Sequence, residues 1–76
     1  MRSAVITANL TRGEAIRLAE KALAFLERAG VDVALEDCLA RELHRPELGV
    51  RLEEARADFL IVIGGDGTVL LSLIHI

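Results

Sequence analysis

The segment that most constrains this chain is a run of five apolar residues that leads directly into a glycine-rich turn. Phe59-Leu-Ile-Val-Ile63 contains no polar residue, and Gly64-Gly-Asp-Gly-Thr68 follows it without a break. A continuous apolar run of this length is typical of a parallel strand that is covered on both faces. Such a strand needs neighbouring strands and covering helices, so we expect an α/β fold.

Two earlier segments predict further strands, with a helix between them. Residues 4–8 are apolar and partly β-branched, and apolar residues alternate over 31–35. Thr11-Arg-Gly-Glu14 has the pattern of a capping box. Apolar residues at helical spacing then continue to about Ala29, and Gly30 supplies a left-handed C-cap.

A shorter helix is predicted after the second strand. Glu36 and Asp37 can cap a helix from about Cys38 to His44, and Arg45-Pro46 ends it because the residue before proline avoids helical torsions. One or two helical turns are expected between residues 48 and 57, and the apolar residues after Thr68 predict a last helix.

The order β-α-β-α-β-(α) predicts a Rossmann-like, three-layer α/β domain with a parallel sheet and right-handed crossovers. Three strands cannot cover both faces of such a sheet. We therefore expect a longer chain or a partner to complete the domain.

The amino-acid composition excludes several classes of protein and of function. A hydrophobic content of 53% with 28% charged residues excludes intrinsic disorder, and a single cysteine excludes an intrachain disulfide. The net charge of −3 and the two aromatic residues give no basis for nucleic-acid binding. Glycines and Asp66 interrupt the apolar stretch 59–76, which argues against a membrane helix. With no targeting pattern at the start, we expect a cytoplasmic protein with Cys38 as a reduced thiol.

The glycine-rich turn carries the chemistry. Glycines permit positive φ and a close approach of ligand to backbone, and successive N–H groups in such a turn attract phosphate oxygens. Thr68 can cap a following helix or bind a phosphate. Asp66 would repel phosphate, so it is better suited to accept a hydrogen bond or a proton from a hydroxyl. The alternative is a tight strand-to-helix turn that Asp66 merely caps.

Other polar residues give weaker signals. Asn9, at the end of the first strand, is a candidate for contact with a nucleotide, although a plain turn residue is the alternative. Cys38 and His44 stand in no nucleophile or ligand pattern, and Asp66 has no second carboxylate near it in the sequence. We therefore predict no metal site built by the protein.

The pentad and the strand before it resemble the NAD kinase family. Lipid kinases of the diacylglycerol and sphingosine types and 6-phosphofructokinases have similar pentads. The first β-α-β unit, from residue 5 to residue 33, favours NAD kinases, and Val69-Leu70 follows the pentad where lipid kinases usually have an Asn-Glu pair. The resemblance extends over residues 4–70, which we expect to be part of a nucleotide-binding domain.

The resemblance implies phosphoryl transfer from ATP, with a divalent metal such as Mg²⁺, to the adenosine ribose 2′-hydroxyl of NAD. Asp66 matches the proton acceptor of the family, and Gly67 matches a backbone contact to the dinucleotide. Gly64, Gly65 and Thr68 complete the binding loop. The family also implies a homo-oligomer and small-molecule nucleotides as partners. Neither nucleic acid nor a membrane is expected as a partner.

The chain departs from the family in length. NAD kinases are several times longer and have a second, all-β domain and a downstream motif that completes the NAD site. We therefore expect the present chain to be inactive alone. Alternatives are part of a lipid or sugar kinase, or a non-catalytic nucleotide-binding module.

The last six residues have a possible origin outside the gene. Leu71-Ser-Leu-Ile-His-Ile76 is one translation of CTG TCT CTT ATA CAC ATC, the adapter end of transposase-based sequencing libraries. The hypothesis is that the genuine protein sequence in this chain stops at Leu70 and that residues 71–76 are read-through of adapter DNA. The alternative is the apolar start of a genuine helix.

Overall fold

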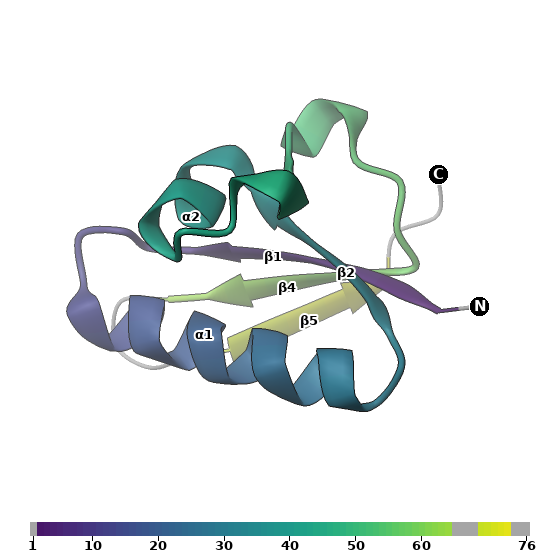
Figure 1. Ribbon diagram of the computed structural model, residues 1–76, viewed down its shortest axis with the longest axis horizontal. Helices are drawn as coiled ribbons and strands as arrows, with labels where there is room; N and C mark the ends of the chain where they lie inside the picture. The colour runs from purple at the N-terminus through teal and green to yellow at the C-terminus, as the bar shows by residue number, and fades with distance from the viewer. Residues whose placement is uncertain (1, 65–68, 74–76) are drawn as a thin grey trace.

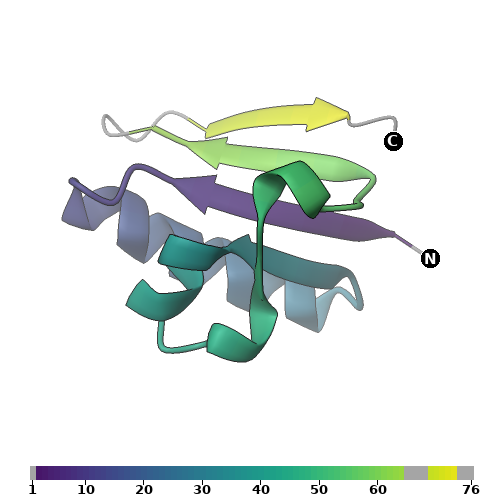
Figure 2. The same ribbon diagram turned by 90° about the horizontal axis from the view of Figure 1, so that it is seen from above.

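The computed structural model describes residues 2–64 and the backbone of residues 69–73. They form one five-stranded sheet in the order β3-β2-β1-β4-β5, seen face-on in Figure 2. The first four strands are parallel, and β5 runs antiparallel to β4. The strands are β1 (Ser3–Ala8), β2 (Asp32–Glu36), β3 (Gly49–Val50), β4 (Phe59–Ile63) and β5 (Val69–Leu73). The predicted α/β class with a parallel sheet is confirmed.

The central strand is β1, which pairs with β2 on one side and with β4 on the other. Ile6 lies level with Leu35 of β2 and with Ile61 of β4. Neighbours at the same level of a parallel sheet point to the same face. Ile6 and Leu35 are fully buried, so this level forms the centre of the core.

Helix α1 (Gly13–Arg28) covers this face of the sheet (Figure 1). Ala15, Ala19 and Leu23 are buried in one cluster with Ile6, so part of the predicted apolar stripe is the packing surface, whereas Phe25 is 71% exposed. Gly30 follows the helix at φ 79°, which confirms the predicted left-handed turn.

The predicted capping box at the start of α1 is wrong. The helix begins at Gly13 after Arg12, and no side chain caps it. The Thr11 hydroxyl instead donates a 2.6 Å hydrogen bond to Asn9 Oδ1. The nearby acceptor on Asn9 therefore removes Thr11 from the capping role.

The short helix α2 (Asp37–Glu42) is capped by Glu36, whose carboxylate accepts a 2.7 Å hydrogen bond from the N–H of Cys38. This cap was predicted, but the helix ends two residues earlier than expected. His44 takes a left-handed conformation with φ 58°, which turns the chain before Pro46 is reached.

The segment after α2 contains two short 3-10 turns, η1 (Pro46–Leu48) and η2 (Leu52–Glu54). Turn η2 confirms the helical turn expected between residues 48 and 57, whereas η1, which begins at Pro46, and the two residues of β3 were not predicted. The chain then crosses from β3, beyond β2, to β4 on the other side of β1. This crossing lies over the sheet face opposite α1, where Ala55 and Val5 are buried (Figures 1 and 2).

The helix predicted after Thr68 is wrong. Residues 69–73 form strand β5, which pairs with β4 so that Val69 lies opposite Ile63 and Leu73 opposite Phe59. Five residues are too few for hydrophobic periodicity to separate helix from strand, and the unpaired edge of β4 offers backbone hydrogen bonds to a strand. Over the described residues, no helix combines the length and the apolar character that crossing a bilayer requires.

Candidate functional site

The candidate site lies where the carboxyl ends of β1 and β4 meet. From β1 the chain proceeds through α1 to β2 on one side, whereas β4 joins β1 on the other side. The strand order therefore reverses between β1 and β4. Open α/β sheets bind ligands in the crevice at such a reversal, beyond the carboxyl ends of the strands.

Asn9 is fixed at this point. Its main-chain N–H donates a 3.0 Å hydrogen bond to the carbonyl of Ile63, the last residue of β4. Asn9 therefore lies beside Gly64, where the glycine-rich turn begins. Both were candidate site residues in the sequence, and the structure brings them together.

The side chain of Asn9 has a defined orientation. Its Oδ1 accepts hydrogen bonds from the N–H of Thr11 at 3.0 Å and from the Thr11 hydroxyl at 2.6 Å. The oxygen must face Thr11 because an N–H group can only donate. The turn therefore does not use the two N–H donors of the Asn9 amide, and Asn9 is exposed.

Gly65, Asp66, Gly67 and Thr68 lie outside the described residues, so their roles stay predictions. The segments on either side give their context. Residues 64–68 connect Ile63 to its partner Val69 in the antiparallel pair of β4 and β5. A strand follows the turn, so the expected phosphate attraction by a helix N-terminus after Thr68 is not part of this structure.

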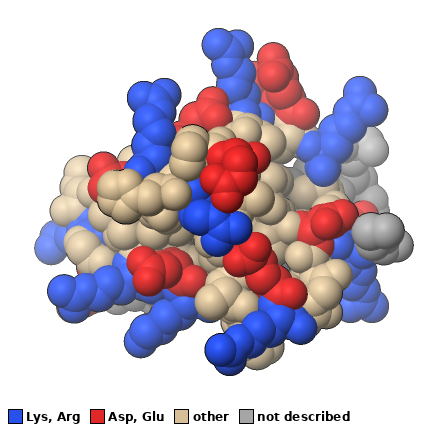
Figure 3. Space-filling view, in the orientation of Figure 1, with Lys and Arg blue, Asp and Glu red and all other residues tan. Residues whose placement is uncertain are grey.

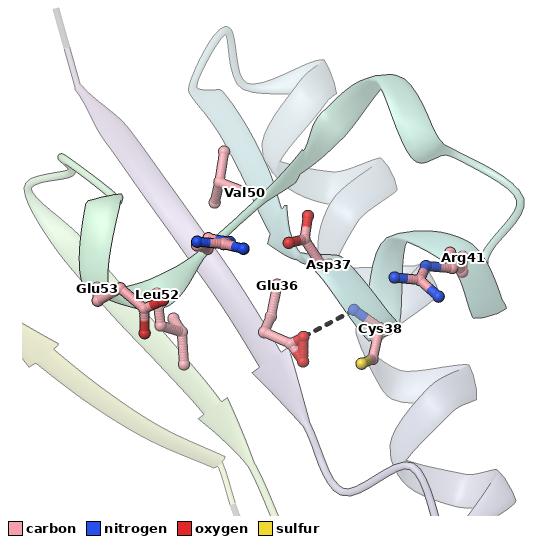
Figure 4. Close-up of a pocket in the computed structure, with 8 residues that line it drawn as sticks. Glu36, Asp37, Cys38, Arg41, Val50, Leu52 and Glu53 are labelled. Carbon is pink, nitrogen blue, oxygen red and sulfur yellow. Dashed lines mark hydrogen bonds between the residues drawn. The ribbon is translucent and has the colours of Figure 1, made fainter.

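Local sequence patterns do not predict the open pocket that the structure has elsewhere on this edge of the sheet. A cavity of ≈ 370 Å³ lies at the carboxyl ends of β2 and β3, on the same edge of the sheet as Asn9 (Figure 4). In Figure 4, the Glu36 carboxylate faces the N–H of Cys38 at the start of α2, and Arg41 projects from the same helix. The pocket is lined by Glu36, Asp37, Cys38, Arg41, Val50, Arg51, Leu52 and Glu53.

The charges near the site are mixed in sign. Three carboxylates and two guanidinium groups line the pocket, and Figure 3 shows acidic and basic side chains interspersed over the visible face. In residues 2–64 and 69–73 no three His, Cys, Asp or Glu side chains are grouped to hold a metal ion.

One surface ion pair has shifted pKa values, and it lies away from the site. Arg45 Nε donates a 2.7 Å hydrogen bond to Glu47, which lowers the pKa of the Glu47 carboxyl. The same bond, together with one from Arg45 to Glu27 at 3.3 Å, raises the pKa of Arg45. Because Arg45 and Glu27 sit on different elements, these contacts join the segment after α2 to α1.

A comparison with protein families decides the assignment. The model of the diacylglycerol kinase catalytic domain matches residues 4–73, nearly the whole chain. The chain belongs to this kinase family. The match begins in β1 and continues through β4 and the glycine-rich turn into β5, so it includes every part of the candidate site.

Within this family, the curated relatives are NAD kinases. The NAD kinase of Methanoculleus marisnigri is 36% identical over 69 residues, which cover 91% of this chain and 25% of the relative. The NAD kinase of Methanothermobacter thermautotrophicus is 37% identical over 66 residues, covering 86% of the chain and 23% of the relative. The NAD kinase of Thermococcus gammatolerans is 42% identical over 67 residues, which cover 86% of this chain and 24% of the relative.

These matches confirm the resemblance to NAD kinases that the pentad and the first β-α-β unit indicated. The chain spans about a quarter of the length of the curated relatives it matches. No solved structure matches the chain.

Proposed function

We propose that this chain is part of an NAD kinase, a phosphotransferase that makes NADP from NAD and ATP. The observation that carries the proposal is the position of Gly64, the first residue of the glycine-rich segment. Gly64 follows β4 at the reversal of the strand order, next to the Asn9–Ile63 hydrogen bond, where this fold class binds nucleotides. The relatives named as NAD kinases supply the substrate class.

In this proposal Asp66 acts as the proton acceptor. The ribose 2′-oxygen of NAD attacks the γ-phosphorus of ATP, the bond from that phosphorus to the bridging oxygen breaks, and ADP leaves. Asp66 accepts the hydroxyl proton as the new O–P bond forms. The backbone N–H groups of Gly65, Gly67 and Thr68 bind phosphate oxygens or the dinucleotide.

Asn9 and Gly64 border the reacting groups. The amide N–H donors of Asn9, which its turn leaves available, can hydrogen-bond a phosphate or ribose oxygen. Residues 2–64 and 69–73 contain no group of side chains that would hold a metal ion. A divalent metal enters here as part of the metal–ATP substrate.

A lipid kinase is the second candidate, because the matching family model is that of diacylglycerol kinases. Both reactions place a hydroxyl against Asp66 and differ in the molecule that carries it. Since the chain spans about a quarter of its relatives, we propose that residues 1–70 belong to the nucleotide-binding domain of a longer kinase. Alone, the chain would lack the residues that choose the acceptor and would be inactive.

The test starts with the gene. We propose that residues 71–76 derive from adapter DNA, and resequencing the source DNA past the codon for Leu70 tests this directly. A continuing reading frame that lacks Leu71–Ile76 supports a longer kinase. A stop codon directly after Ile76 would contradict it and would favour a non-catalytic nucleotide-binding module.

The encoded full-length protein is then assayed with [γ-³²P]ATP and two acceptors, NAD and diacylglycerol. We expect label in NADP and none in phosphatidic acid. Label in the lipid alone would replace the NAD kinase proposal with the lipid kinase one.

A further inference from the structure

The loop between β1 and α1 is held at both of its ends and in its middle. The N–H of Asn9 donates to the carbonyl of Ile63 at 3.0 Å, and the carbonyl of Asn9 accepts from the N–H of Arg12 at 3.2 Å. Between them, the half-buried Leu10 packs against the core cluster. The fold therefore fixes the backbone of this loop, and the side chains of Asn9 and Thr11 are exposed on it.

The freedom that remains to Asn9 is the rotation of its side-chain amide. An exposed amide can turn either its oxygen or its NH₂ group toward a neighbour. The N–H of Thr11, at 3.0 Å, accepts only the oxygen orientation, because an N–H group can only donate. The Thr11 hydroxyl adds a second, shorter bond of 2.6 Å to the same oxygen. Two donors from one residue therefore hold the oxygen toward Thr11 and direct the NH₂ group away from it.

This orientation decides which ligand atoms Asn9 can bind. Both lone pairs of its amide oxygen are used by Thr11, so the group that faces away offers two N–H donors and no acceptor. Phosphate oxygens are acceptors, and they match a donor-only group. The reversed amide would place its own oxygen against the phosphate oxygen, and two acceptors repel each other. An amide held as it is here is therefore already turned for a phosphate oxygen.

We propose that Thr11 is a positioning residue, whose hydroxyl holds the Asn9 amide so that the amide donates to a phosphate oxygen of ATP or of NAD. This inference rests on the proposed function, in which Asn9 borders the nucleotide. Thr11 acts through Asn9 and before the nucleotide arrives, because a side chain that is already oriented loses less freedom on binding. Loss of the hydroxyl should therefore weaken nucleotide binding and leave the chemical step unchanged.

Thr11→Val in the full-length kinase removes the hydroxyl but keeps the β-branched shape and the main-chain N–H. We expect the KM for ATP or for NAD to rise about 2- to 10-fold, as for one lost hydrogen bond, with kcat little changed. The nucleotide whose KM rises identifies the phosphate that Asn9 contacts. Thr11→Ser retains the hydroxyl and should keep the parental KM. Ser3→Ala, the matched control, removes a hydroxyl at the opposite end of β1 and should change neither KM.

A double-mutant cycle with Asn9→Ala tests whether Thr11 acts through Asn9. In the Asn9→Ala background the hydroxyl has no amide to hold, so adding Thr11→Val should raise KM no further. An equal rise in both backgrounds would show that Thr11 contacts the nucleotide directly and would overturn the proposal. Parental KM values in Thr11→Val, or a Thr11→Ser variant as impaired as Thr11→Val, would also overturn it. Thermal denaturation verifies that each variant is folded at the assay temperature.

The outcome for Thr11 can be distinguished from the outcome for the proposed function. If the full-length protein labels neither NAD nor diacylglycerol, the proposed reaction is wrong. The Kd values of ATP and of NAD, measured by equilibrium binding to the same variants, then test Thr11 without any turnover, and the same rise in Kd is expected. If label appears in NADP but Thr11→Val has parental KM values, the positioning role alone is wrong.

Discussion

The main-chain N–H of Asn9 donates to the carbonyl of Ile63 at 3.0 Å, and this bond joins the end of β1 to the end of β4. It extends the pairing of the two strands by one residue beyond Ala8 and Ile63. The first residue of the glycine-rich turn therefore starts from a fixed position at the reversal of the strand order. The site depends on this bond together with the turn that orients the Asn9 side chain.

Two substitutions can distinguish the structural role of Asn9 from its proposed role in nucleotide binding. Asn9→Ala removes the acceptor of both Thr11 hydrogen bonds and should lower the free energy of unfolding by about 1 kcal/mol. Asn9→Asp keeps the acceptor and should unfold like the parent in thermal denaturation. In the full-length kinase, however, it places a negative charge beside phosphates and should raise the KM for nucleotide. Equal KM values for parent and Asn9→Asp would show that Asn9 is only a turn residue.

Ser3 and Asp58 hold the opposite, amino ends of β1 and β4 together. The N–H of Ser3 donates to Asp58 Oδ2 at 3.1 Å, and the N–H of Asp58 donates to the Ser3 carbonyl at 3.0 Å and to Ser3 Oγ at 3.2 Å. Asp58→Ala should cost about 1 kcal/mol in chemical denaturation. Asp58→Asn retains an acceptor and should cost less, and so should Ser3→Ala, because the carbonyl bond remains. Parental stability in all three variants would mean that the side-chain bonds contribute nothing.

Two residues with positive φ should respond in opposite directions. Gly30, at φ 79°, should tolerate alanine poorly, and Gly30→Ala should lower stability by about 1 kcal/mol. His44, at φ 58°, is a non-glycine residue in the same region, so His44→Gly should raise stability by a few tenths of a kcal/mol to about 1 kcal/mol. His44→Ala retains a Cβ atom and serves as the control, with no expected gain. A loss of stability in His44→Gly would show that the imidazole contributes more than the strain costs.

The Arg45–Glu47 pair predicts a small dependence of stability on pH. The Arg45 hydrogen bond lowers the pKa of Glu47 in the folded chain. The pair therefore stabilises the fold at pH values above the ordinary pKa range of a carboxyl group. This contribution is lost as the pH falls through the lowered pKa. The melting temperature of Glu47→Gln should therefore lie slightly below the parent value at neutral pH and approach it in acid. Glu42→Gln, a charge change elsewhere on the surface, controls for net charge, and a constant difference at every pH would contradict the account.

Much of the sheet could be predicted from local patterns. The three main strands and the long helix have strong hydrophobic signals: β1 and β4 are short apolar runs, and apolar residues recur at the strand period in β2 and at the helical period in α1. Gly30 and the Glu36 cap were also readable, since each acts within its own turn. The α1 start was mispredicted because Asn9, outside the capping motif, competes for the Thr11 hydroxyl.

Features that depend on distant residues could not be predicted. Strand β3 is only two residues long and exists because β2 offers an edge, and β5 forms beside β4 for the same reason. The pocket at the ends of β2 and β3 combines side chains from separate segments, and the Asn9–Ile63 bond joins residues far apart in the sequence. By contrast, the glycine-rich segment 64–68 can be recognised in the sequence alone, because its residues are contiguous and follow a buried strand.

The most direct test of the account is Asp66→Asn in the full-length kinase. The substitution keeps the shape of the side chain and one acceptor but removes the base. We predict that kcat for NADP formation falls by roughly 10²-fold or more, while the Kd for NAD, measured by equilibrium binding, changes little. A variant that retains near-parental kcat would contradict the proton-acceptor role and leave Asp66 as a structural residue of the turn.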